Sequence, residues 1–217
     1  MNAGRLDRHV QTPSVLLVPR SFMSRSRLAL TLLTATSLWT GAACAFEVEH
    51  SETRYADRRY QCDLNVRLDA PLDKVEAVLR DYEKYPALDG RILEARVIAR
   101  PAPHVAMLET TLRVCMGWFC RNVKRVERVE ESEHSLAATA DPSRSDVKFG
   151  ETRMQLSPGE NGGTLVHYRT SITPAFWIPS VIGRRWMLRT LEDATGDLFM
   201  NVEIQAKKEG EEKAASN

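Results

Sequence analysis

One long amphipathic helix at the C-terminal end, preceded mainly by strand-like segments, is the feature that most restricts the fold of this chain. From Ile178 to about Ala206 the apolar residues recur with the period of a helix and fall on one of its faces. A helix of this length needs a large apolar surface against which to bury that face. The face consists of Val181, Leu188, Leu191, Leu198 and Val202, with Met187, Ala194 and Phe199 at its margins.

Segments typical of β-strands occupy most of the chain before that helix. They alternate between apolar and polar residues or are rich in β-branched residues, and turn-forming residues separate them. A short helix is expected from Pro71 to about Tyr82, with Tyr85-Pro86 as its breaker, while the polar residues 46–54 are expected to be irregular. The expected strands are residues 60–68, 91–100, 105–116, 119–130, 136–139, 152–156 and 164–172.

This order of elements predicts an α+β protein, because strands joined by short turns pair antiparallel and the resulting sheet can bury the long helix. Five short motifs lie along residues 56–206 in the same order as the elements: Val66-Arg-Leu-Asp-Ala-Pro71, Val75-Glu-Ala-Val-Leu79, Asp81-Tyr-Glu-Lys-Tyr-Pro86, Gly163-Thr-Leu-Val-His-Tyr168 and Pro174-Ala-Phe-Trp-Ile-Pro179. Together they resemble the START-like (SRPBCC) superfamily, in its polyketide cyclase/dehydrase or coenzyme Q-binding START domain branch.

The resemblance implies a helix-grip fold, in which a curved antiparallel sheet of about seven strands wraps around the long C-terminal helix. It also implies an elongated apolar cavity between sheet and helix. Members of the superfamily bind lipids, quinones, polyketides or other hydrophobic ligands; some are cyclases and many are carriers or regulators.

The N-terminal residues are typical of a secretory signal peptide. Arg25 and Arg27 precede an uncharged stretch, residues 28–46, that ends in small residues, and cleavage is expected after Ala45. We therefore expect a secreted or periplasmic protein. The expected division is residues 1–22 as an N-terminal extension from an upstream start, 23–45 as the signal peptide, 46–207 as the START-like domain and 208–217 as a charged tail.

Two alternatives for this N-terminal stretch remain open. A membrane anchor is less favoured, because the apolar stretch is short and diluted by serine and threonine, whereas a spanning helix needs about 20 predominantly apolar residues. Lipid attachment at Cys44 is also less favoured, because the preceding Gly41-Ala-Ala lacks the leucine that a bacterial lipobox usually carries.

Cys115 and Cys120 flank four residues between two expected strands. If residues 116–119 form the hairpin loop, the two cysteines are directly opposed, near the short end of disulfide geometry, and we predict a disulfide. The spacing differs from that of C-x-x-C redox motifs, and no second ligand pair follows for zinc. Cys62 falls on the apolar side of its strand and is expected to be a buried thiol.

Charge argues against a nucleic-acid partner. After residue 45 the chain holds 25 basic and 28 acidic residues, a net charge of −3. The mixed-sign run 121–130 is interpreted as a solvated strand face. Arg184, Arg185 and Arg189 form a basic edge on the long helix, for which a solvated face is the favoured interpretation and contact with lipid headgroups the alternative.

The residues expected at the ligand cavity are apolar or aromatic and lie on inward strand positions, near strand ends or on the long helix. For any single one, ordinary packing is the simpler interpretation, because a filled core and an open cavity are equally apolar. These residues are Leu108, Thr110, Leu112, Trp118, Phe149, Met154, Tyr168, Ile172, Trp177, Trp186, Met187 and Phe199.

No catalytic or metal-binding motif is evident: the sequence has no HExxH, G-x-S-x-G, P-loop or G-x-G-x-x-G pattern, and we expect no cofactor. The favoured function is an exported carrier for a hydrophobic small molecule, with transient membrane contact. The first alternative is a cyclase or dehydratase using the same cavity, with Tyr168 or Arg153 as its polar group. The second is an envelope interaction protein whose cavity is collapsed.

Overall fold

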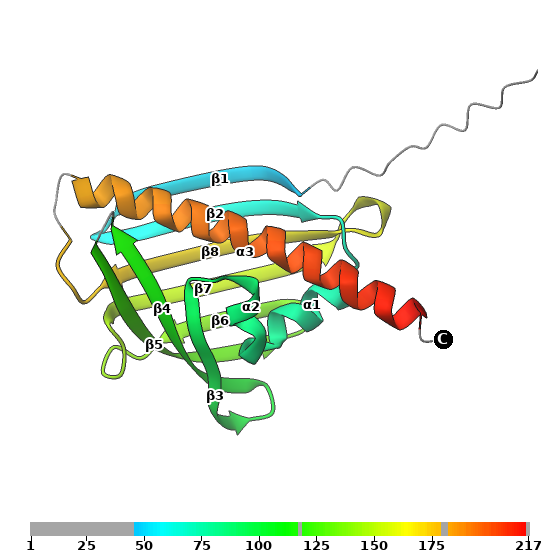
Figure 1. Ribbon diagram of the computed structural model, residues 1–217, viewed down its shortest axis with the longest axis horizontal. Helices are drawn as coiled ribbons and strands as arrows, with labels where there is room; N and C mark the ends of the chain where they lie inside the picture. Colours follow the sequence, from blue (N-terminus) through cyan, green and yellow to red (C-terminus); the bar gives the residue numbers. More distant parts are fainter. Residues whose placement is uncertain (1–45, 117–118, 179–181, 216–217) are drawn as a thin grey trace, which may run out of the picture. The chain divides into compact units, whose positions relative to one another are not determined.

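The computed structural model describes residues 46–116, 119–178 and 182–215. In this part of the chain eight strands form one antiparallel sheet, in the order β1-β2-β8-β7-β6-β5-β4-β3. The long helix α3 (Ile182–Ala215) runs across one face of that sheet (Figure 1). The predicted α+β, helix-grip fold is confirmed.

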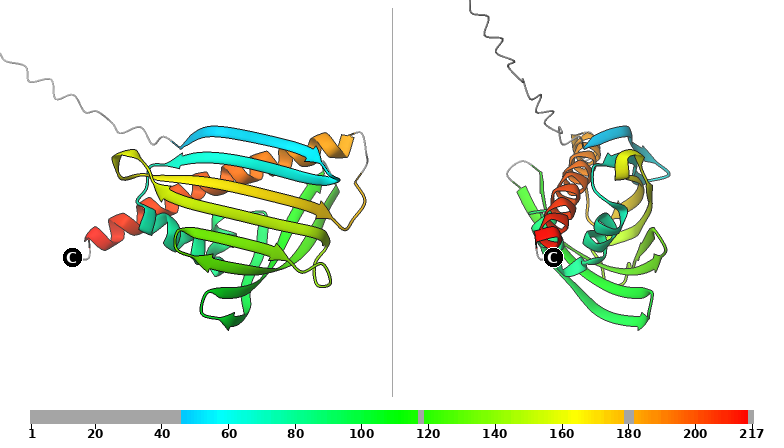
Figure 2. Two further views of the ribbon diagram at one scale, coloured as in Figure 1. Left: turned by 180° about the vertical axis from the view of Figure 1, so that it is seen from behind. Right: turned by 90° about the vertical axis from the view of Figure 1, so that its right-hand side faces the viewer.

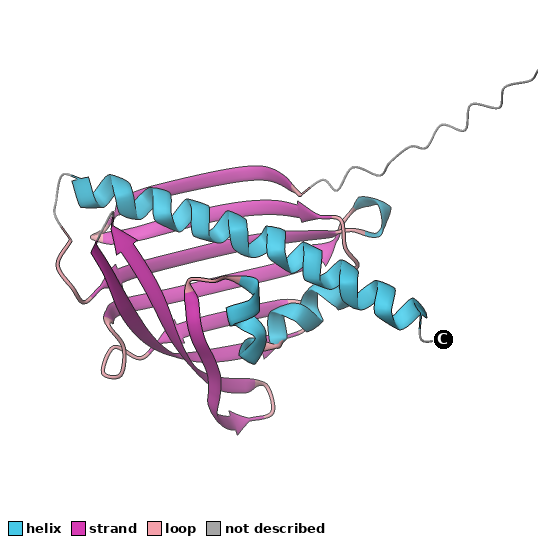
Figure 3. Cartoon of the chain, in the orientation of Figure 1, coloured by secondary structure: helices cyan, strands magenta, loops and turns pink. Residues whose placement is uncertain are grey.

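The two remaining helices lie on the same face of the sheet as α3 (Figure 3). They follow the second strand and lead directly into the third, so the chain crosses the inner face of the sheet early. In chain order the elements before α3 are β1 (Glu47–Ala56), β2 (Arg59–Leu68), α1 (Leu72–Arg80), the 3-10 turn η1 (Tyr82–Lys84), α2 (Tyr85–Leu88), β3 (Ile92–Ala102), β4 (Val105–Met116), β5 (Phe119–Ser132), β6 (Ser135–Ala140), β7 (Val147–Pro158), the 3-10 turn η2 (Glu160–Gly162) and β8 (Thr164–Pro174).

The sheet has one strand more than the seven expected, and the additional strand is β1. The prediction of irregular backbone for residues 46–54 is wrong: β1 pairs antiparallel with β2 over nearly its whole length. Because it is an edge strand with almost every residue exposed, no alternation of apolar and polar residues marks it. Its strand character comes from the hydrogen bonds that β2 offers.

Helical structure extends further along the chain than expected at two places. The first helix, α1, ends at Arg80, close to the expected Tyr82, but residues 85–88 form a second helix, α2, with proline in its first turn, where a missing N–H has no cost. Residues 208–215, the first part of the expected charged tail, continue α3, because lysine, glutamate and alanine are good helix formers.

The core lies between α3 and the inner face of the sheet. Along β2 every second residue is buried, which is the predicted alternation, and Cys62 is a free thiol with 2% exposure, as expected. On α3, Phe199 and Val202 are completely buried. Burial of this apolar stripe is the main source of stability for the arrangement, at about 25 cal/mol per Å² of apolar surface.

Polar contacts hold α3 in place at its C-terminal half. Glu203 is 3% exposed, and its carboxylate accepts hydrogen bonds from the Asp69 N–H at 2.9 Å and the Lys207 Nζ at 2.9 Å. Asn201 Nδ2 donates to the Leu88 carbonyl at 2.8 Å. These bonds tie α3 to the β2–α1 connection and to α2, so the helix sits at a fixed height above the sheet.

The β4–β5 hairpin carries the predicted disulfide. Cys115 and Cys120 face each other in the strand register and are joined, with their Cα atoms 3.9 Å apart. Because the closed loop is only a few residues long, the bond constrains the unfolded chain little.

Two glycines give a matched test of backbone packing. A Cβ at Gly163 would lie 2.7 Å from the Leu68 carbonyl oxygen, whereas a Cβ at Gly196, inside α3, would meet nothing within 4 Å. We expect Gly163→Ala to destabilise the fold by about 1–3 kcal/mol and Gly196→Ala to stabilise it by about 0.5–1 kcal/mol. Urea unfolding of both variants measures the difference; equal effects would contradict the close approach at Gly163.

Candidate functional site

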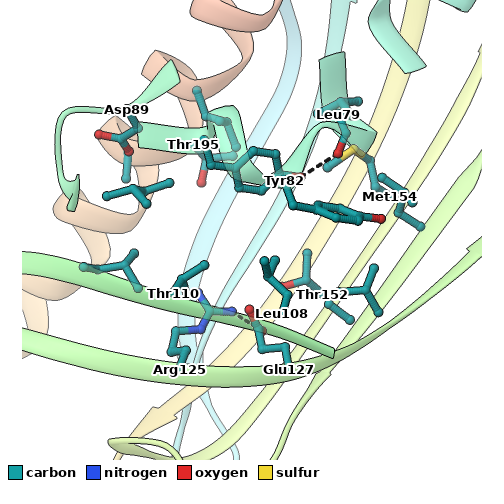
Figure 4. Close-up of a pocket in the computed structure, with 18 of the residues that line it drawn as sticks. Leu79, Tyr82, Asp89, Leu108, Thr110, Arg125, Glu127, Thr152, Met154 and Thr195 are labelled. Atoms are coloured by element: carbon teal, nitrogen blue, oxygen red, sulfur yellow. Dashed lines mark hydrogen bonds and ion pairs between the residues drawn. The ribbon is translucent and has the colours of Figure 1, made fainter. Parts of the chain in front are cut away.

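A cavity of about 230 Å³ lies between the inner face of the sheet and the helices (Figure 4). Strands β3 to β8 form its floor and walls, while α1, η1, α2 and α3 cover it. Its apolar lining consists of Leu79, Ile92, Leu108, Leu112, Val129, Leu136, Ala138, Met154, Leu191, Ala194 and Leu198. Its polar lining consists of Tyr82, Tyr85, Asp89, Thr110, Arg125, Glu127, Thr152, Tyr168 and Thr195.

The period of the strands explains why a charged pair lies among these apolar groups. Side chains two residues apart share one face of a strand, so Arg125 and Glu127 on β5 point inward together with Val129. The intervening Val126 lies on the other face, and the loop after β6 covers it: the Ser145 hydroxyl accepts a hydrogen bond from its N–H at 2.9 Å.

Arg125 and Glu127 form an ion pair, in which the arginine Nη2 donates to the carboxylate (Figure 4). Glu127 is 5% exposed. Burial disfavours the charged guanidinium, but the adjacent carboxylate outweighs that effect and raises the pKa of Arg125 above its ordinary value. The Arg125 Nε is buried without a hydrogen-bond partner among the described residues. It is therefore a donor that a bound molecule can use.

Two of the tyrosines at the cavity already have partners. The Tyr85 hydroxyl donates to the Leu79 carbonyl at 2.7 Å, and the Tyr82 hydroxyl donates to Glu131 at 2.9 Å. Burial raises the pKa of both phenols, so they stay protonated. Their rings contribute apolar surface, and their hydroxyls hold η1 and α2 against the neighbouring elements.

Tyr168 on β8 also lines the cavity. Its ring packs edge-on against that of Phe199, with the centroids 5.5 Å apart. Burial raises the pKa of its hydroxyl, and hydrogen bonding with Thr170 and the positive charge of Arg125 only partly offset this. Tyr168 is thus a neutral hydroxyl next to a fixed positive charge.

Asp89 lies at the side of the cavity beneath α3. Its carboxylate accepts a hydrogen bond from the Arg91 Nε at 2.8 Å, and the Arg91 Nη2 donates to Asp197 on α3 at 3.0 Å. These three residues connect the α2–β3 turn to the long helix. Their charges are paired with one another, so Arg125 remains the group with an unused buried donor.

The structure brings five of the twelve predicted cavity residues together in the lining: Leu108, Thr110, Leu112, Met154 and Tyr168. All five are on inward positions of β4, β7 and β8, where strand alternation alone locates them. That they contact a ligand stays a prediction.

Six of the other predicted residues do not line the cavity. Phe199 and Met187 are buried in packing between α3 and the sheet, and Ile172 pairs with Tyr60 and Gly150 near the end of β8. Phe149 lies beneath the guanidinium of Arg59, at 3.7 Å from the ring centroid. Trp177 is 81% exposed, Trp186 is half-buried, and Trp118 lies outside the described residues.

Sequence reasoning missed Arg125 and Glu127. The interpretation of residues 121–130 as a solvated strand face is wrong for Arg125 and Glu127, which point into the cavity together with Val129. The sequence did contain an indication: Arg125 and Glu127 lie on the same side of the strand as Val123 and Val129, which are buried. Arg153, the other polar group considered for a cyclase, is exposed on the outer face of β7.

The described parts of the chain hold neither a cluster of metal ligands nor a helix suited to span a membrane. Within residues 46–116, 119–178 and 182–215 no three His, Cys, Asp or Glu side chains are grouped so as to hold a metal ion. Across the same residues no helix combines the length and the apolarity that crossing a membrane requires.

Fold and site together define a helix-grip protein whose internal cavity is apolar apart from one buried ion pair and a few hydroxyl groups. The chain belongs to the family described as polyketide cyclase/dehydrase and lipid transport, which matches residues 60–203. A search of curated proteins found no match.

Solved structures support the same fold at low sequence identity. The STAR-related lipid transfer protein of Xanthomonas axonopodis is 13% identical, with a TM-score of 0.57 over 75% of this chain and 98% of that one. A START superfamily protein of Mycobacterium smegmatis is 16% identical, with a TM-score of 0.55 over 68% and 97%. The Zhui aromatase/cyclase of Streptomyces sp. R1128 is 12% identical, with a TM-score of 0.55 over 69% and 94%.

Proposed function

We propose that this protein binds a hydrophobic small molecule that carries one hydrogen-bond-accepting or anionic group, and that it acts as an exported carrier. The observation that carries the proposal is the Arg125 guanidinium, buried in an apolar cavity with an unused Nε donor. A carbonyl, hydroxyl or carboxylate oxygen of the ligand satisfies that donor, while the alkyl or ring part replaces water along the apolar walls.

The family supports this choice of ligand class, because its members include lipid-transport proteins and cyclases that act on hydrophobic molecules. The cavity of about 230 Å³ is smaller than pockets that enclose drug-sized molecules. In this conformation it therefore accommodates a compact ligand. A longer molecule requires α3 or α2 to move outward.

Export is part of the proposal and rests on the sequence of residues 23–45. Solvent extraction and mass spectrometry of protein purified from its native envelope test both parts at once. We expect a bound lipid, quinone or polyketide-like molecule, and a mature chain that begins at Phe46. Recovery of an empty protein that also fails to bind apolar fluorescent probes would refute the carrier function.

A cavity-filling pair of variants assigns the binding to this cavity. Ala138 lines it, whereas the preceding Ala137 points to the outer face, beside Arg153. We expect Ala138→Phe to reduce the affinity for an apolar fluorescent probe at least tenfold, because the ring occupies the ligand's volume, and Ala137→Phe to leave it within twofold. Titration of both variants with the probe measures this, and equal affinities would place the ligand elsewhere.

A cyclase or dehydratase activity is the second candidate, and one observation favours it. The carboxylate of Glu127 and the neutral hydroxyl of Tyr168 both border the cavity, so it holds groups able to accept and donate a proton. Extraction discriminates between the candidates: a carrier releases its ligand unchanged after incubation, whereas an enzyme converts it.

A further inference from the structure

One end of the sheet carries arginines around an exposed tryptophan. We call this surface the basic end. The β1–β2 turn, the start of β5, the residues after β8 and the first turns of α3 all lie at this end, on the left in Figure 1 and on the right in the left-hand view of Figure 2. Its residues are Arg58, Arg59, Arg121, Arg184, Arg185 and Arg189, together with Trp177.

Cation–π contacts join the segments of the basic end. The Arg121 guanidinium lies 4.9 Å from the centre of the Phe176 ring, and that of Arg184 lies 4.3 Å from the centre of the Tyr55 ring. The first contact fixes the residue before Trp177 against β5, and the second fixes the start of α3 against β1. The tryptophan and the arginines are therefore held at the same end by contacts on both sides.

The positive charge at this end is local and largely unpaired. Arg185 and Arg189 are exposed and form no ion pair with any described residue. The acids in the adjoining segments are Asp57, Asp146, Glu192 and Asp193, of which Asp146 lies 4.0 Å from Arg121 and Glu192 accepts a hydrogen bond from Ser51 of β1. Residues 46–217 as a whole carry a net charge of −3, so the basic end contrasts with the rest of the surface.

Trp177 has the most exposed large hydrophobic side chain in the described part of the chain, at 81%. An exposed indole has a cost in water, but at a membrane interface its ring contacts acyl chains while its N–H stays among the headgroups. Arginines beside it attract anionic lipid phosphates. Single-stranded nucleic acid is a poorer fit, because it stacks on several rings along a basic groove, and here Arg121 covers the neighbouring Phe176.

We propose that the basic end docks on an anionic lipid surface, with Trp177 inserted at headgroup level and Arg185 and Arg189 on the lipid phosphates. The cavity lies close to this end, since Leu191 in its lining follows Arg189 by two residues. Docking there brings the cavity near the bilayer. The proposal goes beyond ligand binding and needs no ligand to be present.

Vesicle co-sedimentation tests the docking, with protein purified from cells that express the whole chain. Each basic residue near an anionic surface strengthens binding about fivefold, so Arg185→Glu/Arg189→Glu should weaken binding to phosphatidylglycerol vesicles at least 25-fold. Trp177→Ala should weaken it about tenfold. Raised salt should release the protein, because screening shortens the reach of the charges.

Arg153→Glu/Lys208→Glu is the matched control, because it makes the same change in net charge at two exposed residues outside the basic end. It should bind like the unmodified protein. Equal loss in both double variants, equal binding to phosphatidylcholine vesicles, or binding to an oligonucleotide but not to vesicles would each overturn the proposal. Probe binding in the cavity, measured on the same variants, should stay unchanged, which separates this surface from the proposed function.

Discussion

Phe199→Ala should destabilise the protein by about 3–5 kcal/mol, the cost typical of removing a fully buried phenyl ring. Phe199 has no exposed surface, and its ring contacts that of Tyr168 at 5.5 Å between centroids. The substitution therefore leaves a void between α3 and β8. It also frees Tyr168 to move into that void, so we expect apolar probe affinity to change along with stability.

Urea unfolding measures this effect, and Met200→Ala is the control on the next residue of α3. Met200 is 42% exposed, so its truncation should change the free energy of unfolding by less than about 0.5 kcal/mol. A similar loss in both variants would mean that α3 does not present this face to the sheet.

The parts of the fold that sequence reasoning located are those where burial imposes a period. In β2, Leu64 and Val66 alternate with half-buried polar residues because one face packs on α3, and that pattern can be read without coordinates. In β1 neither face is buried, so its residues carry no such pattern and its existence depends on the partner strand. Pro86 was interpreted as a helix breaker, but it lies in the first turn of α2. A proline ends a helix or begins one according to its position, which the local sequence does not fix.

The same distinction separates the cavity residues that the sequence predicted from those that it did not. Leu108 and Met154 were predicted because they lie on the apolar side of their strands. Arg125 and Glu127 were missed because charged residues on a strand usually face water. Burial of either charge alone would be strongly destabilising, and the opposite charge of its partner offsets that cost. For Trp177 the error has the opposite sign: an aromatic residue just after a strand was expected at the cavity but is exposed, because nothing in a loop's sequence specifies which way its side chains point.

Glu127→Leu should destabilise the protein by about 3 kcal/mol, more than the loss of an exposed ion pair. The cause is the group left behind: without the carboxylate, the Arg125 guanidinium remains in the cavity without its counter-charge. Arg125→Met should be similarly costly, because it leaves the carboxylate of Glu127, which is 5% exposed, without a partner. Urea unfolding of the two single variants measures both costs.

The double variant Arg125→Met/Glu127→Leu separates the role of the pair in stability from its role in binding. Because apolar replacement of a buried ion pair is often neutral or stabilising, we expect the double variant to recover most of the stability lost in either single variant. It should still bind apolar probes, yet lose the preference for a fatty acid over the alcohol of equal chain length that we expect from the unused Nε donor. Arg153→Met, on the outer face of β7, should keep that preference. If the double variant retains the preference, Arg125 is not the group that selects the ligand. If its instability equals the sum of the single effects, Arg125 and Glu127 do not act as a pair.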